Sequence, residues 1–469
     1  MSDPETKAPD DLDDEMSDQT LVHGLSSERE ERIVEALDQN DSERVTELIA
    51  PVHYADVADL LERLDDGDRE QLVNIIRPNI SGDMLSELDG AVLDHIVDVI
   101  GLDEVAAAVT DLDSDDAVVI LEELEAHEQQ QVLDAMPEGD RAIIVEALAY
   151  PEDSAGRLMQ RELVTMPAHW TVGDAIDFLR ANADSEDNPL PDQFYMIYVV
   201  DPAHRPIGKL SLDKVLRTRR PVPLSDVMLT EFKTVPVTAD QEDVALLFRQ
   251  RDLVAAPVVD DGGRLVGTIT IDDIVDVIDE EHEEDIMRMG GVREDDLSDA
   301  VVDTTKARFS WLFVNLLTAS MVIGLFDATI DQMVALAILM PIVASMGGNA
   351  GTQTLTVAVR ALAMKELTAT NAMRVVGKEL IVGGFNGVLF AVLTGLVAWL
   401  WFGSTALGAV IGLAMVVNMV VAGLAGTAIP LALDRAGIDP AIASSVFLTT
   451  ITDVVGFFIF LGLAGLILL

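Results

Sequence analysis

Residues 380–433 read LIVGGFNGVLFAVLTGLVAWLWFGSTALGAVIGLAMVVNMVVAGLAGTAIPLAL, a stretch of 54 residues without a charged side chain. About 20 apolar residues cross a bilayer as a helix, so this run predicts two membrane spans. Glycine and small polar residues interrupt it near Trp401-Phe-Gly-Ser-Thr, where we expect the turn between the spans. The stretch therefore makes this part of the chain an α-helical membrane domain.

Three more apolar runs flank this stretch, at 309–326, 333–359 and 440–469. Together they predict five transmembrane helices within 307–469. Basic side chains occur only before the first span, between the second and third, and between the fourth and fifth. By the positive-inside rule, the chain is a multi-pass protein of the cytoplasmic membrane, with its N-terminal half in the cytoplasm and its C-terminus outside.

The rest of the chain is strongly acidic. The net charge is −52, from 82 acidic and 30 basic residues among 469. From residue 304 onward seven acidic and seven basic side chains cancel, so 1–303 carries the whole excess. A salt-rich cytoplasm explains such acidity, and so do acidic surfaces that repel one another until divalent cations neutralise them. Bulk charge does not separate these two explanations.

Composition excludes several classes of function. Neither half has the basic face that nucleic-acid binding requires, and the absence of cysteine excludes disulfide scaffolds and thiolate metal sites. No motif pairs an acid and base or activates a nucleophile, so we do not expect an enzyme. Residues 1–25 are acidic and lack an apolar core, which predicts a disordered tail rather than a signal peptide.

Two internal repeats organise the soluble half. DVADLLERLDDGDREQLVNII (56–76) resembles DAVVILEELEAHEQQQVLDAM (116–136), which predicts an α-helical superhelix over 26–150. Within 151–278, YVVDPAHRPIGKLSLDKVL (198–216) aligns with PVVDDGGRLVGTITIDDIV (257–275). Each copy reads strand, helix, strand, glycine turn, strand, helix, and this tandem α/β order resembles a pair of CBS domains.

The second CBS-like copy carries a candidate nucleotide motif. Gly267, Thr270 and Asp273 fit the pattern Gly-x-x-Ser/Thr-x-x-Asp, by which CBS domains hold a ribose, whereas Lys214 replaces the aspartate in the first copy. We therefore expect ATP or another adenine nucleotide, if one binds, at the second copy. Many CBS pairs bind no ligand, and that alternative stays open.

Residues 279–306 are expected to form a helix that connects the soluble half to the membrane, with a break at Gly290-Gly291. Glu281, Glu284 and Asp285 lie at positions i, i+3 and i+4, so a helix presents all three on one face. Such a face is either simply solvated or a surface that binds cations.

Asp453 is the only acidic residue well inside a predicted span. A carboxylate near the bilayer centre costs roughly 2.5–3.5 kcal/mol on insertion scales, and Asp453 follows Pro440 by about 20 Å of helix. A protonated or internally bonded aspartate is one explanation. Because no basic residue is embedded nearby, a cation is the favoured partner.

A second polar feature lies inside the second span, at PIVASMGGNAGTQ (341–353). Glycines in membrane helices often serve close packing. Here, however, Asn349, Thr352 and Gln353 follow the glycines, and their oxygen atoms can line a wet path. Neutral oxygens together with one carboxylate suit a hard cation.

Four motifs, PIVASMGGNAGTQ, TTITDVVGFF, YPEDSAGRLM and EEHEEDIMRMGGV, resemble the MgtE family of magnesium channels or transporters. The resemblance covers nearly the whole chain from about residue 30, in the same domain order. It implies a homodimer in the lipid bilayer, with one pore at the subunit interface and a "plug" helix over 279–306 that gates it. Ser445-Val446 departs from the family, because many members carry Gly-Pro there.

The resemblance also assigns residues. Asp453 matches the pore carboxylate, and Asn349 falls in the pore-lining motif. The plug acids are Glu281, Glu284 and Asp285, while Asp111, Asp115 and Asp116 approximate the metal ligands of the N domain.

The sequence thus predicts a magnesium-selective channel or transporter that cytosolic magnesium closes. Two alternatives remain, a transporter of cobalt or manganese and a membrane-anchored CBS sensor that conducts nothing.

Overall fold

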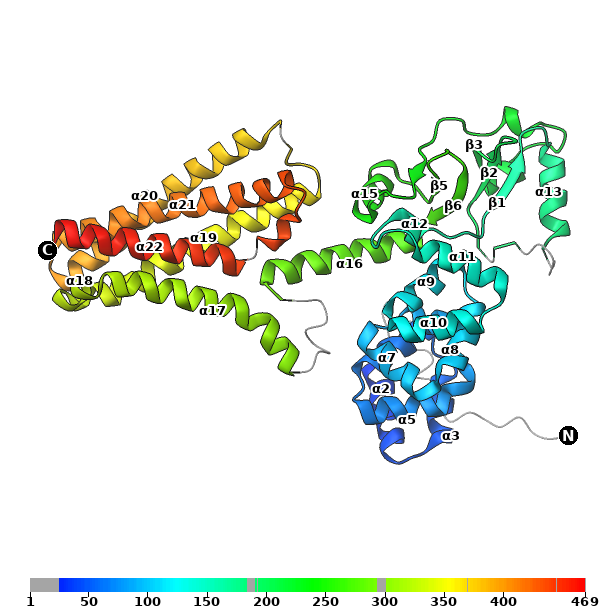
Figure 1. Cartoon of the computed structure of the whole chain (residues 1–469), viewed down its shortest axis with the longest axis horizontal. Helices are drawn as coiled ribbons and strands as arrows, with labels where there is room; N and C mark the ends of the chain where they lie inside the picture. Colours follow the sequence, from blue (N-terminus) through cyan, green and yellow to red (C-terminus); the bar gives the residue numbers. More distant parts are fainter. Residues whose placement is uncertain are drawn as a thin grey trace. The chain divides into compact units, whose positions relative to one another are not determined.

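The computed structural model describes residues 25–183, 190–191, 193–292, 301–368, 370–443 and 445–468. The chain divides into two compact units, Met1–Ile278 and Asp279–Leu469 (Figure 1). The predicted tail at residues 1–25 lies, apart from its last residue, outside the described residues.

The first unit begins with a stack of short helices. They are α2 (Ser27–Asp38), α3 (Ser42–Ile49), α4 (Tyr54–Arg63), α5 (Asp66–Ile76), α6 (Gly82–Ser86), α7 (Gly90–Ile100), α8 (Leu102–Thr110), α9 (Ser114–Glu123), α10 (Ala126–Ala135) and α11 (Glu138–Leu148). One continuous apolar core runs through all of them, from Ile33 to Ala147. Such continuity is typical of a superhelix whose units bury their faces against their neighbours.

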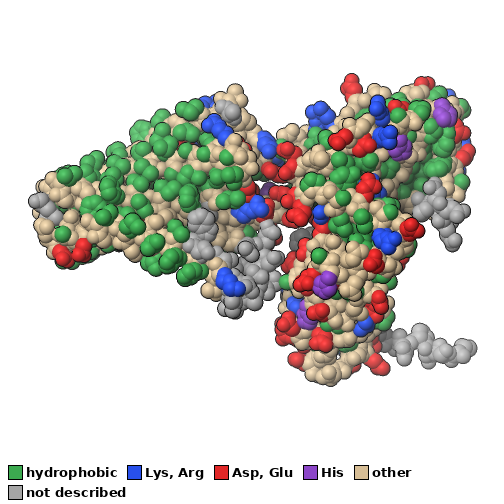
Figure 2. Space-filling view, in the orientation of Figure 1, with side chains coloured by type: hydrophobic (Ala, Val, Ile, Leu, Met, Phe, Trp, Pro, Cys, Tyr) green, Lys and Arg blue, Asp and Glu red, His purple; other side chains and the backbone are tan. Residues whose placement is uncertain are grey.

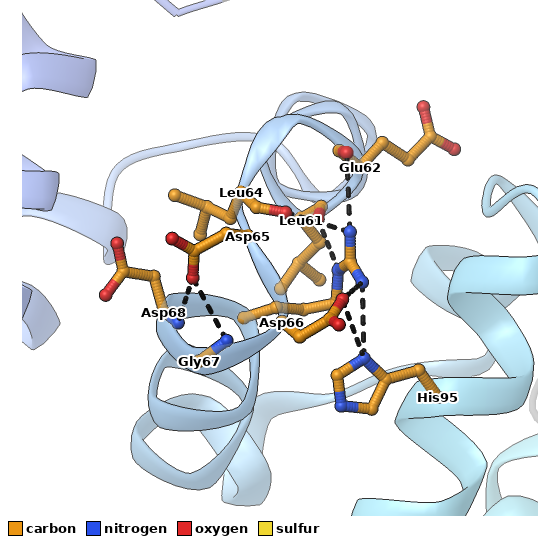
Figure 3. A network of polar contacts seen from close by, with 9 residues as sticks. Leu61, Glu62, Leu64, Asp65, Asp66, Gly67, Asp68 and His95 are labelled. Carbon is orange, nitrogen blue, oxygen red and sulfur yellow. Dashed lines mark hydrogen bonds and ion pairs between the residues drawn. The ribbon is translucent and has the colours of Figure 1, made fainter. Parts of the chain in front are cut away.

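The repeat predicted at an offset of 60 recurs in the polar contacts. The Arg69 guanidinium donates to the carbonyl oxygens of Leu61 at 2.8 Å and Leu64 at 2.9 Å, at the end of α4 (Figure 3). Sixty residues later, Gln129 Nε2 donates to the carbonyl oxygen of Leu121 at 2.7 Å, near the end of α9. Both side chains satisfy carbonyl groups that a helix end leaves without a partner.

Two small sheets follow, each with a parallel and an antiparallel pairing. The first contains β1 (Val164–Pro167), β2 (Met196–Val200) and β3 (Pro206–Ser211), and the second contains β4 (Val235–Pro236), β5 (Ala255–Val259) and β6 (Leu265–Thr270). The accompanying helices are α12 (Ala155–Leu158), α13 (Val172–Ala181), α14 (Leu212–Arg217), α15 (Gln241–Arg251) and α16 (Ile271–Gly290). The two sheets even share a register shift, at Val199/Val200 and at Val258/Val259. The element order predicted for the tandem duplication is confirmed.

The second unit is a helical bundle. Its helices are α17 (Val301–Leu325), α18 (Asp327–Gln332), α19 (Val334–Ala363), α20 (Ala372–Phe402), α21 (Thr405–Arg435) and α22 (Ser445–Ile467). Four of them, α19 to α22, are long and apolar enough to cross a membrane, and Leu312–Leu325 of α17 is a shorter apolar helix among the described residues. These four helices account for four of the five predicted spans.

Helix α21 is the most buried of these helices and packs against α19, α20 and α22. The predicted turn near Trp401 is confirmed. Helix α20 ends at Phe402, Gly403 adopts a φ of 69°, and the Ser404 hydroxyl accepts from the Leu407 N–H at 3.2 Å to begin α21. Hydrophobic side chains cover the visible face of this bundle, whereas acidic side chains are spread over the first unit (Figure 2).

Candidate ion sites

An acidic cluster lies within the first unit, where the helical stack meets the CBS-like sheets. Asp115 and Asp116 occupy the first turn of α9, and Asp273 occupies the first turn of α16. Asp115 is buried, and Asp116 and Asp273 are partly buried. Residues 115 and 273 are far apart in the sequence, so the fold brings together acids that the sequence presented as separate motifs.

Polar contacts fix the start of α9 in this position. Gln160 Nε2 donates to Asp113 Oδ2 at 2.6 Å, and the Ser114 hydroxyl donates to Glu162 Oε2 at 2.9 Å. The Arg161 N–H in turn donates to the Ser114 hydroxyl at 2.8 Å. Because Gln160 also pairs with Thr268 of β6, this segment holds the start of α9 beside the strand from which α16 continues.

The cluster is electrostatically strained. Burial, together with the neighbouring carboxylate of Asp273, raises the pKa of Asp115 well above its usual value. Burial and neighbouring carboxylates raise the pKa of Asp116 to about 6. Burial raises the pKa of Asp273 to about 7, although hydrogen bonds from Thr270 oppose the shift. Since the strongest charges acting on Asp115 and Asp116 are other carboxylates, a bound cation would relieve the repulsion.

The acidic surface extends beyond these three residues. Burial and the nearby carboxylate of Asp276 raise the pKa of Glu87, which follows α6. Asp111, by contrast, is exposed at the end of α8. Asp113, and not Asp111, joins Asp273 and Asp116 among the carboxylates that act on Asp115. Sequence reasoning missed Asp113 and Glu87, although the density of acids around 111–116 was a visible signal.

Among the described residues, no three His, Cys, Asp or Glu side chains converge tightly enough to enclose a bare metal ion. Magnesium does not require such a cage, because it keeps several waters and is usually held through one or two carboxylates. The donors of the acidic cluster are all oxygen atoms, which fits a hydrated hard cation.

The candidate nucleotide motif is partly covered by the chain itself. A Cβ added at Gly267 would lie 2.6 Å from Met159 Sδ and 2.8 Å from the Gln160 carbonyl oxygen. Asp273 Oδ2 accepts from the Thr270 N–H at 3.1 Å and from its hydroxyl at 2.9 Å. Asp273 thus stabilises the start of α16 through Thr270 and also belongs to the acidic cluster.

A basic pocket of about 200 Å³ opens on the first CBS-like copy, which sequence reasoning had set aside. Lys209, Lys214 and Arg217 line it together with Asp213. Asp213 pairs with Arg217 at 2.5 Å, which leaves the two lysines as excess positive charge. Burial lowers the pKa of Lys209. In so acidic a chain, a pocket with this charge favours an anionic ligand.

The plug acids occupy the C-terminal half of α16. Arg288 forms ion pairs with Glu284, one turn earlier, and with Asp439, just before α22. Burial and the nearby charge of Asp439 raise the pKa of Asp285. Met289 packs into an apolar cluster formed by α19, α21 and α22. Arg288 and Met289, which sequence reasoning missed, therefore fasten this end of α16 to the bundle.

A polar stripe runs along α19. Ser345, Asn349, Gln353 and Thr356 recur at helical spacing, and all four are exposed. Exposed amides are rare on membrane helices, because lipid offers no hydrogen-bond partner. The predicted pore residue Asn349 thus belongs to a continuous hydrophilic face.

The candidate pore carboxylate lies on the helix next to this stripe. A Cβ added at Gly348 would lie 3.5 Å from Thr449 and 3.8 Å from Thr452 of α22, so α19 and α22 meet there. Asn349 follows Gly348, and Asp453 follows Thr452. Asp453 is half-buried and lies about 12 Å along α22 rather than the predicted 20 Å, because a 3-10 turn, η4 (Pro440–Ile442), precedes the helix.

A buried amide on α21 completes this part of the bundle. Asn418 is 0% exposed, and its Nδ2 donates to the Val343 carbonyl oxygen at 2.8 Å. Its Oδ1 has no hydrogen-bond partner among the described residues. A side-chain hydrogen bond between membrane helices contributes about 0.6 kcal/mol on average, whereas a buried acceptor without a partner costs about 1–3 kcal/mol. The amide therefore adds no net stability.

Three family models match the sequence. The model of MgtE, described as a divalent cation transporter, matches residues 340–463, that of the MgtE intracellular N domain matches 52–153, and that of the CBS domain matches 224–280. The magnesium transporter MgtE of Bacillus subtilis is 30% identical, over 87% of this chain and 90% of that protein. The magnesium transporter MgtE of Thermus thermophilus is 33% identical, over 92% and 97%.

Two solved structures align with the soluble half of the chain. The cytosolic domain of the Mg2+ channel MgtE in complex with ATP is 28% identical, covering 53% of this chain and 99% of that one, with a TM-score of 0.47. The soluble part of a magnesium transporter is also 28% identical, over 54% and 98%, with a TM-score of 0.45.

Proposed function

The chain belongs to the MgtE family, whose members are transporters and not enzymes, and on that premise we propose that it is a magnesium-selective channel or transporter closed by cytosolic magnesium. Magnesium is then the substrate of the membrane unit and the regulatory ligand of the soluble unit. The chain forms five membrane spans, with α17 as the first. Its soluble part lies in the cytoplasm and its C-terminus outside.

The polar stripe of α19 is the observation that carries this proposal. A face of amides and hydroxyls is unfavourable against lipid, but it suits the wall of a water-filled path. In a two-fold homodimer, the same face of a second copy lies opposite. Two copies each of Asn349 and Asp453 then surround a hydrated ion and hold it with few carboxylates, as magnesium prefers.

Ion selection follows from the donors. The stripe and Asp453 offer oxygen atoms alone, and the apolar half contains neither cysteine nor histidine. Softer divalent metals such as cobalt prefer nitrogen or sulfur ligands, so these donors favour magnesium over cobalt. Manganese shares the preference for oxygen and is the relevant competitor in a selectivity measurement.

Regulation rests on the acidic cluster and the end of α16. Without magnesium, Asp115, Asp116 and Asp273 repel one another and oppose packing of the helical stack against the CBS-like domains. Magnesium bound between them removes that repulsion and favours a compact soluble unit. Because α16 runs on from Asp273 to Glu284 and Asp285, we assign it the role of carrying this change to the pore as the plug helix.

We assign an adenine nucleotide to the basic pocket of the first CBS-like copy rather than to the motif around Gly267. Lys209 and Lys214 supply the positive charge that phosphate groups require. The motif of the second copy is less suited, because Met159 and Gln160 lie against Gly267 and Asp273 belongs to the acidic cluster.

Magnesium flux into liposomes that contain the purified full-length chain tests the proposed function. We expect Asp453→Asn to reduce this flux by about a hundredfold, because an amide supplies a dipole without the charge that offsets ion dehydration. Asp331→Asn is the matched control, since Asp331 is an exposed carboxylate on α18. Wild-type flux through Asp453→Asn would remove the pore assignment. A wild-type chain that passes no ion would favour a sensor without conduction.

A further inference from the structure

Asn418 lies where three membrane helices meet. Its side chain projects from α21 into a cradle made by two glycines, Gly347 of α19 and Gly456 of α22. A Cβ added at Gly347 would lie 2.1 Å from Asn418 Nδ2, and one added at Gly456 would lie 2.9 Å from the same atom. Only residues without a side chain fit at these two positions while the amide is in place.

The orientation of this amide is fixed by its hydrogen bond. The acceptor at 2.8 Å is the backbone carbonyl of Val343, which has no proton to donate, so the atom facing it is Nδ2. Oδ1 is then enclosed between the helices, without a partner among the residues that the structure describes. The amide is therefore oriented in one way and incompletely satisfied.

Stability does not explain an amide at this position. The free energy gained from the hydrogen bond of Nδ2 is no larger than the free energy lost by burying Oδ1 without a partner. An apolar side chain of the same shape would avoid that loss. The two glycines of the cradle, in contrast, are close to the candidate pore residues. Gly347 precedes Asn349 by two residues, and Gly456 follows Asp453 by three, which is about one helical turn.

We infer that Asn418 is a positioning residue of the pore, because its amide, bonded to Val343 and wedged between Gly347 and Gly456, sets the spacing of α19 and α22 and thereby the distance between Asn349 and Asp453. The inference rests on the proposed function, since it concerns the geometry of that pore. Asn418 itself is buried and touches no ion.

The first test replaces the amide by an apolar side chain that also branches at Cγ. We expect Asn418→Leu in the full-length chain to lower the ratio of magnesium to sodium flux in liposomes by about tenfold or more, because small displacements of ion-binding groups have large effects. The melting temperature in detergent should stay equal or rise. Asn386→Leu is the control, since Asn386 is exposed on α20, and its flux ratio should match wild type.

The second test, a double-mutant cycle, covers the case in which leucine does not fit the cradle. Gly347→Ala places a methyl group on the amide, so it should lower the selectivity ratio as Asn418→Ala does. The double variant should be no worse than either single one, because the two substitutions disturb the same contact. Effects that multiply in the double variant would overturn the inference.

The outcomes separate this inference from the proposed function. If the wild-type chain conducts magnesium and the flux ratio of Asn418→Leu stays within about twofold of wild type, the role of Asn418 alone is overturned. A displaced ligand would produce a larger change than that. A wild-type chain that passes no magnesium overturns both. A selectivity loss accompanied by a lower melting temperature in both Asn418→Leu and Asn418→Ala identifies a packing defect and also overturns the positioning role.

Discussion

At the scale of single residues, the carboxyl groups of the acidic cluster are held where ionisation is unfavourable. Asp116 and Asp273 have pKa values of about 6 and about 7, close to the pH of a cytoplasm. Between pH 4 and pH 7 the folded chain therefore binds more protons than the unfolded one. The stability that comes from these two groups is present at low pH and is lost as the pH rises through their folded pKa values.

The same two groups make magnesium binding depend on pH. In the proposed mode of binding, the ion contacts the ionised carboxylates, so protons compete with it at pH 6 but hardly at pH 8. We expect the magnesium midpoint for thermal stabilisation of the full chain to be about tenfold higher at pH 6 than at pH 8, as one displaced proton with a pKa of about 7 requires. Asp273→Asn should flatten this dependence. Equal midpoints at both pH values would exclude the cluster as the sensor.

Lys214 is the residue on which the nucleotide assignment depends. Lys214→Glu should weaken ATP binding by tenfold or more, roughly the cost of replacing an attractive charge by a repulsive one. Equilibrium dialysis with labelled ATP measures the affinity, and Lys233→Glu is the control, because Lys233 is exposed and outside the pocket. If Asp273→Asn abolishes binding while Lys214→Glu does not, the motif of the second copy is the site.

At the scale of elements, α16 is one helix of 20 residues that begins at the last strand of the CBS-like sheet. Its sequence contains no helix-stop signal before Gly290, and Gly291 has a φ of 73° at the predicted break. Asp273 in its first turn and Asp285 in its fourth thus belong to the same helix. In the proposed mechanism, this helix carries a displacement at the acidic cluster to the plug acids.

The plug acids make this role of α16 testable. Millimolar magnesium should protect the 279–306 linker from protease, and Glu281→Gln/Glu284→Gln/Asp285→Asn should move that protection to higher magnesium by several-fold, since ligands are lost. Glu283→Gln is the control, because Glu283 is exposed on the same helix. Ionic strength must be held constant, as salt screens repulsion. An unchanged midpoint in the triple variant would make these acids a solvated face.

Elements with strong local patterns could be predicted from the sequence. The duplicated strands, the helical repeat and the turn at Gly403 follow from periodicity and turn residues. Relations between distant residues could not, because no pattern within α9 or α16 shows that Asp115 and Asp273 lie close together. Asn418 was missed for the same reason. It stands out as an amide within VVNMVV, but its significance depends on glycines of two other helices.

At the scale of the whole molecule, charge is segregated along the chain. The acidic excess lies in residues 1–303, and residues 304–469, which contain the helical bundle of the second unit, are neutral. That unit nevertheless exposes a polar stripe on α19 as well as apolar side chains on α20. A single chain in lipid leaves the stripe without polar neighbours, and a symmetric pair removes this conflict.

Cross-linking tests the pairing directly, because the chain has no cysteine of its own. A short bismaleimide with a reach of about 10 Å, the spacing of packed helices, should join two copies of Asn349→Cys and yield a covalent dimer on a denaturing gel. Val392→Cys, on the exposed face of α20, should remain monomeric. The opposite pattern would place the interface on α20 and leave the stripe outside it.

The connection between α20 and α21 has a mechanical consequence. Only Gly403 and Ser404 separate these two 31-residue helices. The helices also approach closely, because a Cβ added at Gly395 would lie 2.8 Å from the Gly408 carbonyl oxygen, and one added at Gly408 would lie 2.6 Å from that of Gly395. The two helices thus form a stiff hairpin without slack, in which neither can slide along the membrane normal alone. A bilayer that becomes thinner or thicker must tilt both helices together. A change in lipid thickness therefore moves α20 and α21, the helix that carries Asn418, as one body.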